Sequence, residues 1–286
     1  MKFQIPNKLA VIVNFKKKNA IAISKKIIAE LLNQKKTIYI TEKLSEKIKE
    51  ENCIIIDAKQ IPKFVNTIIA IGGDGTFIGV AREYSQYAIN ILPINIGFLG
   101  FLSELTAEQF LENSNIINSN DIYIEKRMIL EYTIENNKGF AINEITISPR
   151  AISRLITINV NINNQHFTNI RADGIIVSTP TGSTGHSLSA GGPIVNPNLN
   201  CIAFTPLSAH SLAIRPIILS AEDMVELSYT SKKLDSAAIT IDGQLQIPLK
   251  KNISIIIRSA KHTFNIVKLN KIRYYDLIKT KLKWNQ

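Results

Sequence analysis

The sequence predicts an α/β domain followed by a β-rich domain, and three observations support this fold class. Up to about residue 122, short apolar runs alternate with stretches in which apolar residues recur every three or four positions. Beyond residue 122, apolar and polar residues alternate one by one, and Asn and Gly separate the runs. The chain has 286 residues and is 45% hydrophobic, which is enough for about two domains.

In the first part, strands and helices are expected to alternate. The apolar run at 8–15 predicts a strand, and the spacing of Ile23, Ile27 and Leu31 predicts a helix over 19–33. Strands that alternate with helices form βαβ units, so we expect a parallel sheet covered by helices. The other elements expected here are strands at 37–40, 53–57, 67–71 and within 89–97, and helices at 42–50 and 76–86.

The second part predicts antiparallel strands with one face open to water. Runs such as YIEKRMILEYTIE and RLITINVNIN are rich in Ile, Thr, Val and Tyr, and turn formers at 136–139 and 163–164 join them to their neighbours. The last segment, 271–284, has helical spacing and a basic face typical of a solvated surface. Further strands are expected at 201–205, 217–219, 224–230, 237–241, 253–258 and 262–268.

The chain is strongly basic, with 34 Lys plus Arg against 23 Asp plus Glu and a formal charge of +11. Such a surplus attracts nucleic acid, lipid headgroups or phosphorylated small molecules. The heavy use of Ile, Lys and Asn offers another explanation, which is the drift expected in an AT-rich genome. Because no basic motif interleaved with aromatic residues occurs, we expect no nucleic-acid partner.

Cysteine usage and the N-terminus bear on location. Cys53 and Cys201 lack CxxC spacing, which argues against a disulfide framework or zinc site and favours a reducing compartment, the cytoplasm. The apolar stretch near the N-terminus ends in lysines rather than in a small-residue cleavage site, so it predicts a first strand and not a signal peptide. No apolar run reaches about 18 residues, and we expect no membrane span.

Residues 68–77 read IIAIGGDGTF, a strand that runs into a glycine-rich turn. In open α/β sheets, ligands bind at the carboxyl ends of the strands, where such a turn aims backbone N–H groups at an anion. Thr76 and the residues after it can begin a helix, whose N-terminus adds partial positive charge. Gly72, Gly73 and Gly75 therefore predict a phosphate site.

A carboxylate in the middle of this turn, that of Asp74, is unexpected in a phosphate site, because it repels phosphate. It can hold a divalent cation that bridges phosphates, or it can accept the proton of an attacking hydroxyl. The alternative is that Asp74 caps the helix and the glycines only form a tight turn. Neither a P-loop, G-x-x-x-x-G-K-[ST], nor a dinucleotide turn, G-x-G-x-x-G, is present in the segment.

A second polar cluster follows a predicted strand in RADGIIVSTPTGSTGHSLSAGGPIV, residues 171–195. Its hydroxyls and mobile backbone suit ribose, phosphate and base edges, and Pro180 and Pro193 argue against the alternative of a disordered loop. Upstream, Asn143 and Glu144 interrupt an apolar strand pattern. One of them then points where apolar neighbours point and needs a partner, which a ligand supplies; the alternative is an ordinary edge strand.

These segments together resemble the NAD kinase family. The order GGDGT, NE, RADGIIVSTPTGST and SLSAGGPIV is similar to that family over residues 67–245, and diacylglycerol kinases, sphingosine kinases and phosphofructokinases resemble it only in the glycine turn. The resemblance implies an α/β domain at 1–122, a β-rich NAD-binding domain at 123–269, and a final segment, 270–286, that packs back on the first domain. It also implies ATP and NAD⁺ as substrates, and a homodimer or homotetramer.

The resemblance assigns roles to positions of this chain. Asp74 corresponds to the proton acceptor for the 2′-hydroxyl of the adenosine ribose, beside Gly72, Gly73, Gly75 and Thr76 at the phosphates. Because no lysine stands in a phosphate-loop position of the sequence, we expect Mg²⁺ to neutralise the phosphates. The remaining implied positions are Asn143 and Glu144 for the ribose and ATP, Arg171 and Asp173 for the nicotinamide end, Thr184, Gly185, His186, Ser187, Leu188 and Ser189 for the adenosine, and Arg154 and Gln244 for further contacts.

One segment departs from the family pattern. The family commonly reads STAYS where this chain has Ser183-Thr184-Gly185-His186-Ser187. His186 can stack on a base or donate a hydrogen bond, so we expect altered dinucleotide geometry with the reaction class retained. Two other functions stay open from the residues: a lipid or sugar-alcohol kinase with the same turn, and a nucleotide-binding module without turnover.

Overall fold

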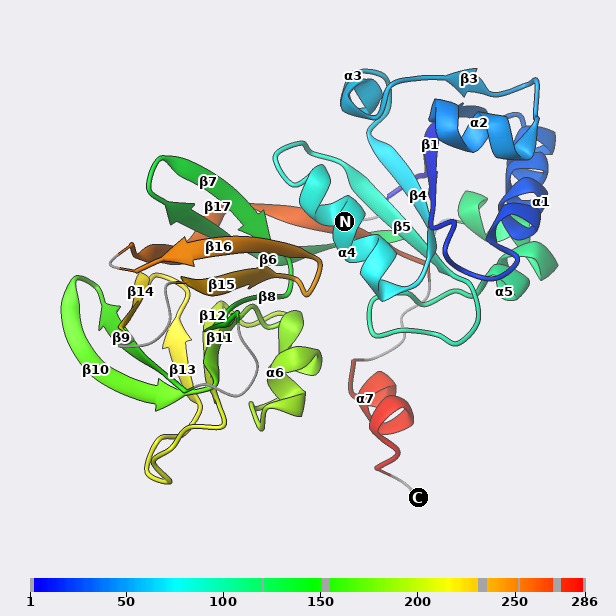
Figure 1. Cartoon of the computed structure of the whole chain (residues 1–286). Helices are drawn as coiled ribbons and strands as arrows, with labels where there is room; N and C mark the ends of the chain where they lie inside the picture. Colours follow the sequence, from blue (N-terminus) through cyan, green and yellow to red (C-terminus); the bar gives the residue numbers. More distant parts are fainter. Residues whose placement is uncertain are drawn as a thin grey trace. The chain divides into compact units, whose positions relative to one another are not determined.

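A computed structural model describes residues 3–119, 121–150, 155–230, 236–251, 253–269 and 274–284 (Figure 1). The chain divides into two compact units. The first unit comprises residues 1–126 together with 264–286, and the second comprises residues 127–263. The long strands β6 (Tyr123–Ile134) and β17 (Ile255–Lys268) each have residues in both units.

The first unit contains a parallel sheet with the strand order β5-β4-β1-β2-β3. The last part of β17 adds to it, since Asn265 and Ile266 pair in parallel with β5. All residues of β4 and β5 are buried, as expected for central strands covered on both faces. The strands are β1 (Lys8–Val13), β2 (Thr37–Ile40), β3 (Ile54–Ile55), β4 (Thr67–Gly72) and β5 (Asn90–Asn95).

Helices of the first unit pack on this sheet through their apolar faces. Ile27 and Leu31 of α1 and Phe110 of α5 are fully buried in the same core as the strands. Phe77 of α4 lies 5.9 Å, centroid to centroid, from the ring of Phe264. The helices are α1 (Ala20–Asn33), α2 (Glu42–Ile48), α3 (Ile61–Phe64), α4 (Asp74–Glu83), α5 (Ala107–Glu112) and α7 (Tyr274–Leu282), with 3₁₀ turns η1 (Ala58–Gln60) and η2 (Ser114–Asn118).

The second unit is β-rich, with a core enclosed by strands of two sheets. One sheet has the antiparallel order β13-β12-β11-β8-β15-β16, and the other contains β10-β9-β14 with residues 255–257 of β17. In the sheet that contains β10, β9 and β14, β6 pairs with β7 and with β17. The strands are β7 (Asn137–Ala141), β8 (Glu144–Pro149), β9 (Ile156–Ile162), β10 (Gln165–Ala172), β11 (Gly174–Ser178), β12 (Cys201–Leu207), β13 (Ile217–Ser220), β14 (Val225–Thr230), β15 (Ser236–Ile241) and β16 (Leu245–Lys250).

The predicted fold class is confirmed, while several element boundaries were wrong. The helix expected at 76–86 begins at Asp74, because Gly73 takes the extended N-cap position. The strand expected at 53–57 has only two residues, both exposed at the sheet edge. The strands expected at 253–258 and 262–268 form one strand, Ile255–Lys268, since no Gly, Pro, Asn or Asp lies between them. No helix among the described residues is long and apolar enough to cross a bilayer.

Candidate active site

In the first unit, three neighbouring parallel strands end at the same edge of the sheet, and polar residues follow each of them. Asn14 follows β1, Gly73 and Asp74 follow β4, and Asn95 is the last residue of β5. Because ligands of open α/β sheets bind at this edge, a site is expected at these strand ends.

The glycine turn after β4 is held by hydrogen bonds from two directions. The Oγ1 of Thr76 accepts from the backbone N–H of Gly73 at 3.4 Å and from Nδ2 of Asn14 at 2.9 Å. A Cβ on Gly72 would overlap the side chain of Thr76, so only glycine fits at that position. The side chain of Thr76 therefore fixes the turn from within, and the backbone of Gly73 and Gly75 forms its outer part.

Asp74 is mostly buried in the first turn of α4, and its two carboxylate oxygens differ. Its Oδ2 accepts a hydrogen bond from the backbone N–H of Phe101 at 2.8 Å, whereas its buried Oδ1 has no hydrogen-bond partner among the described residues. Burial raises the pKa of Asp74, and the N–H groups of Phe101 and Leu102 and the charges of Lys281 and Lys268 partly offset this rise. A buried carboxylate with one unsatisfied oxygen is suited to take a proton from a ligand.

The sequence analysis missed two residues that shape this turn. A Cβ built on Gly100 would overlap the carboxylate of Asp74, and a Cβ on Gly73 would lie 3.5 Å from Cε of Lys17. The two missed residues are Gly100, in the loop that follows β5, and Lys17, in the loop that follows β1. Strands β5 and β1 are the two neighbours of β4 in the sheet. Inspection of all three strand ends, rather than of the glycine turn alone, would have found them.

In the second unit, the carboxylate of Asp242 organises the NE segment. It accepts hydrogen bonds from the backbone N–H groups of Ile142 at 3.0 Å, Asn143 at 2.7 Å and Glu144 at 3.2 Å. Asp242 lies in the tight turn between β15 and β16 with a left-handed φ of 50°. The sequence analysis assigned no role to Asp242, so this anchoring role was missed.

Glu144 and Asn143 each have a side-chain oxygen without a hydrogen-bond partner among the described residues. These oxygens, Oε2 of Glu144 and Oδ1 of Asn143, are buried. A Cβ built on Gly185 would lie 3.7 Å from Nδ2 of Asn143 and 3.8 Å from Oε2 of Glu144. Burial, and then the charge of Asp242, raise the pKa of Glu144 to about 7. The edge-strand explanation of this pair is wrong, because β8 lies between β11 and β15.

The hydroxyl-rich segment forms the 3₁₀ turn η3 (Gly182–Thr184) and the short helix α6 (His186–Ser189). Its residues divide into two groups. Ser187 is fully buried and shares a hydrogen bond of 2.9 Å with Thr205, so its side chain supports the segment from inside. Thr184, Gly185 and Leu188 are partly exposed, and His186 and Ser189 are exposed, so this group is open to a ligand.

Three of the other expected contacts lie at strand ends or in turns of the second unit. Arg171 and Asp173 are exposed around the junction of β10 and β11, and the N–H of Asp173 donates to the carbonyl of Leu207 at 3.0 Å. Gln244 is exposed in the turn that contains Asp242. Arg154 lies outside the described residues, so the structure gives no account of it.

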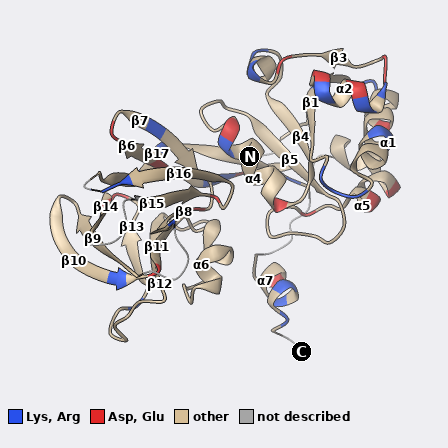
Figure 2. Cartoon of the chain, in the orientation of Figure 1, with Lys and Arg blue, Asp and Glu red and all other residues tan. Residues whose placement is uncertain are grey.

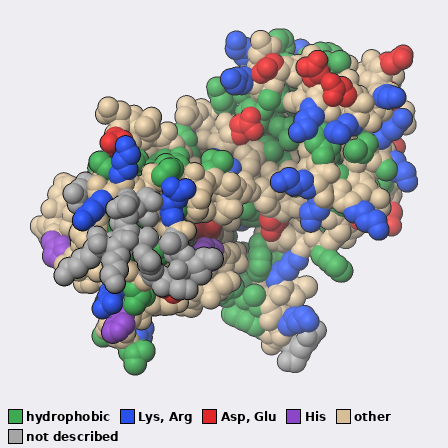
Figure 3. All heavy atoms as spheres, viewed as in Figure 1, with side chains coloured by type: hydrophobic (Ala, Val, Ile, Leu, Met, Phe, Trp, Pro, Cys, Tyr) green, Lys and Arg blue, Asp and Glu red, His purple; other side chains and the backbone are tan. Residues whose placement is uncertain are grey.

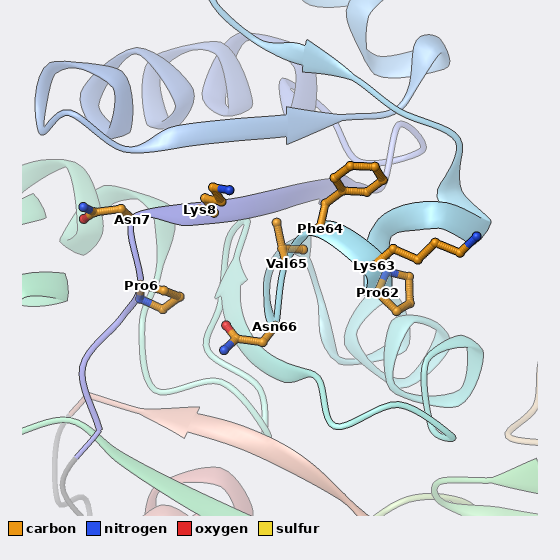
Figure 4. A pocket seen from close by; sticks show the side chains of 8 residues that line it. All are labelled: Pro6, Asn7, Lys8, Pro62, Lys63, Phe64, Val65 and Asn66. Carbon is orange, nitrogen blue, oxygen red and sulfur yellow. The ribbon is translucent and has the colours of Figure 1, made fainter.

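Described residues of the first unit line two cavities that differ in their relation to Asp74. One, of about 420 Å³, is lined by residues 6–8 and 62–66, at the amino ends of β1 and β4 and so at the edge opposite the glycine turn (Figure 4). The other, of about 570 Å³, is lined by Phe98 and Leu99 and by residues of α7 that include Lys281. The second borders the loop that holds Asp74, and it is the cavity relevant to the site.

Comparison with known proteins identifies related chains. Family models match the ATP-NAD kinase N-terminal domain over residues 9–122 and the ATP-NAD kinase C-terminal domain over residues 142–269. An NAD kinase of Lachnoclostridium phytofermentans is 36% identical over 287 residues, covering 96% of this chain and 98% of the relative. An NAD kinase of Geobacter sp. strain M21 is 31% identical over 285 residues, covering 98% and 99%.

Solved structures share the fold at lower identity. Yeast NADH kinase complexed with NADH matches with a TM-score of 0.90 at 21% identity, covering 100% of this chain and 89% of that one. An NAD kinase from Archaeoglobus fulgidus in complex with ATP matches with a TM-score of 0.75 at 22% identity, covering 96% and 98%. The two domain models and the full-length relatives show that the chain belongs to the NAD kinase family.

Proposed function

We propose that this protein transfers the γ-phosphate of ATP to the 2′-hydroxyl of the adenosine ribose of NAD⁺, giving NADP⁺ and ADP. The observation that carries the proposal is the unpartnered, buried Oδ1 of Asp74 within a glycine turn at the carboxyl edge of a parallel sheet. Family membership supports it, as do relatives named NAD kinase and structural neighbours described with NADH and with ATP.

In this proposal Asp74 is the proton acceptor. The ribose oxygen forms a bond to the γ-phosphorus, the bond from that phosphorus to the β,γ-bridging oxygen breaks, and the hydroxyl proton passes to Oδ1 of Asp74. The N–H of Phe101 holds the other carboxylate oxygen and thereby fixes its direction. Because burial raises the pKa of Asp74, the carboxylate is a stronger base than a solvated aspartate.

The backbone of Gly72, Gly73 and Gly75 binds phosphate in this scheme. These residues form the turn at the N-terminus of α4, where the helix dipole favours negative charge. Thr76 contributes indirectly, because its hydroxyl is used to hold the turn. Phosphoryl transfer depends mainly on alignment and charge neutralisation, and a rigid turn of this kind supplies the alignment.

Mg²⁺ is part of the proposal, and the residues present fit it. Within the described residues no group of three His, Cys, Asp or Glu side chains forms a metal cage. Mg²⁺ in kinases is commonly bound through one or two protein oxygens plus substrate phosphates and water, and Oε2 of Glu144 and Oδ1 of Asn143 are unpartnered oxygens of this kind. The bound cation would supply charge neutralisation on the phosphates.

The second unit contributes the nucleotide contacts in this proposal. Asn143 and Glu144 bind the ribose and the ATP side, and Asp173 with Arg171 bind the nicotinamide end. The exposed part of the 182–189 segment binds the adenosine, with Ser187 supporting it from behind. The residues proposed to contact the adenosine directly are Thr184, Gly185, His186, Leu188 and Ser189, with Arg154 and Gln244 as further contacts.

The decisive test is synthesis of NADP⁺ by the purified chain. We expect incubation with NAD⁺, ATP and Mg²⁺ to yield NADP⁺, read with an NADP⁺-specific dehydrogenase, and no product without ATP. ATP consumption with a lipid or sugar alcohol but not with NAD⁺ would overturn the proposal in favour of another kinase. Nucleotide binding without any turnover would overturn it in favour of a binding module.

Assembly and location are further parts of the proposal. A homodimer or homotetramer is carried over from the family resemblance and is tested by light scattering on the purified chain. A cytoplasmic location is supported by cysteine usage, since Cys53 and Cys201 are both free thiols in the structure. Localisation of the tagged protein in its own cells would test it.

A further inference from the structure

Three consecutive lysines, Lys16, Lys17 and Lys18, occupy the turn between β1 and α1, and all three are exposed. The blue stretch of the loop after β1 marks them in Figure 2, and Figure 3 shows basic side chains gathered on this face of the first unit. The side chain of the middle one, Lys17, lies close to the glycine turn. A Cβ built on Gly73 would lie 3.5 Å from Cε and 3.7 Å from Nζ of Lys17.

The position of Lys17 follows from how the turn after β1 is fastened. The N–H of Asn14 donates to the carbonyl of Ile71 in β4, and its Nδ2 donates to Oγ1 of Thr76 in α4. Oδ1 of the same side chain accepts a hydrogen bond from the backbone N–H of Lys16 at 3.0 Å. The backbone carbonyl of Asn14 accepts one from the backbone N–H of Lys17 at 3.2 Å. Asn14 therefore links the turn that contains the three lysines to the end of β4 and to the glycine turn.

Lys17 is also available to bind an anion. No ion pair joins its ammonium to a carboxylate within the part of the chain that the structure describes. The glycine turn itself has no lysine in a phosphate-loop position, but a lysine from the neighbouring strand end lies beside Gly73. An unpaired ammonium beside such a turn is suited to a phosphate chain.

We propose that Lys17 binds the phosphate chain of the nucleotide held by the glycine turn, and so supplies charge neutralisation in addition to Mg²⁺. This inference rests on the proposed kinase function. Either substrate carries a phosphate chain, the triphosphate of ATP or the diphosphate of NAD⁺. The triphosphate is the expected partner because its charge is denser.

The experiment compares the full-length protein with Lys17→Gln, and uses Lys16→Gln and Lys18→Gln as matched controls from the same turn. KM is measured separately for ATP and for NAD⁺, and ATP affinity is measured by calorimetry. We expect Lys17→Gln to weaken ATP binding about tenfold, as for one exposed charge-assisted contact, and to leave KM for NAD⁺ unchanged. Lys17→Arg should restore most of the loss, and the difference should shrink at high salt.

Each outcome bears on the proposal. A loss confined to NAD⁺ supports a phosphate contact and assigns it to the dinucleotide. An unchanged Lys17→Gln, or an equal loss in all three glutamine variants, overturns it, because a diffuse basic surface would then explain the effect. If the unaltered protein makes no NADP⁺, the proposed function fails, and calorimetry with ATP or NAD⁺ alone still decides whether Lys17 contacts phosphate.

Discussion

Gly100 stands directly against the carboxylate of Asp74, so that a Cβ at position 100 would overlap it. The backbone of this loop also fixes the carboxylate, since the N–H of the next residue, Phe101, donates to Oδ2 of Asp74. The loop that follows β5 thus sets the position of a side chain that follows β4. This arrangement makes the proposed base sensitive to changes outside the glycine turn.

We first predict that Gly100→Ala displaces the Asp74 carboxylate and lowers kcat about 10²-fold, because a misplacement of about 1 Å is costly in catalysis. Gly97→Ala is the matched control in the same loop. Gly97 has a φ of 89° and nothing within 4 Å of an added Cβ, so this change should cost about 1 kcal/mol of stability and leave kcat near the original value. Equal kcat values for the two variants would contradict the prediction.

The second prediction concerns Asp74→Asn, which keeps the shape of the side chain and removes its basicity. We expect the fold to be retained and kcat to fall by about 10²–10⁴-fold, the usual contribution of a general base. Circular dichroism and thermal unfolding check the fold, and NADP⁺ formation measures the rate. A variant that turns over at the original rate would remove Asp74 from the role of base.

The third prediction is a shift in the pH–rate profile on removal of Lys281. The charges of Lys281 and Lys268 lower the pKa of Asp74 against the rise caused by burial, alongside the N–H groups of Phe101 and Leu102. Lys281→Gln should therefore raise the pKa of Asp74 and move the acid limb of kcat/KM to higher pH. Lys279→Gln, on the same helix, serves as the control, and an identical shift in both variants would indicate a general charge effect.

The fourth prediction is that Glu144→Gln stabilises the protein at high pH. The pKa of Glu144 is raised from its ordinary 4.5 to about 7, so the folded protein holds this proton more tightly than the unfolded chain does. The contribution of Glu144 to the free energy of unfolding is complete below about pH 4.5 and is lost as pH rises through 7. The difference in this free energy is about 3 kcal/mol at most. Urea unfolding of both proteins at pH 5 and pH 8 measures it. If Glu144→Gln raised the free energy of unfolding only at pH 5 and not at pH 8, the prediction would be contradicted.

Much of the fold was predictable from local patterns, because buried parallel strands and helices have distinct periodicities. The strand ending at Gly72 and the helix from Ala20 to Asn33 are of this kind. Boundaries were less predictable where tertiary packing decides them. The start of α4 at Asp74 depends on hydrogen bonds that Thr76 makes with Gly73 and Asn14, and nothing in the local sequence reports the contact with Asn14.

The candidate site was predictable only where a motif lies in one continuous segment. Asp74, Asn143 and Glu144 were found because their neighbours in sequence are unusual for a strand. Gly100 and Asp242 were missed, because each acts across a long separation in the chain, against Asp74 and against the N–H groups of residues 142–144. Their own surroundings in sequence resemble ordinary loops and hairpins.

The last prediction tests Asp242 as the anchor of the NE segment. Asp242→Ala leaves the N–H groups of Ile142, Asn143 and Glu144 without their acceptor, and we expect a loss of about 3 kcal/mol or more in the free energy of unfolding. Asp242→Asn retains one acceptor oxygen and tolerates the left-handed φ of 50°, so it should lose less.

Because the charge of Asp242 raises the pKa of Glu144, Asp242→Asn should also lower that pKa and flatten the pH dependence of stability. Urea unfolding at pH 5 and pH 8 measures both effects, and equal losses in the two variants would show that the turn geometry, and not the three hydrogen bonds, holds the segment.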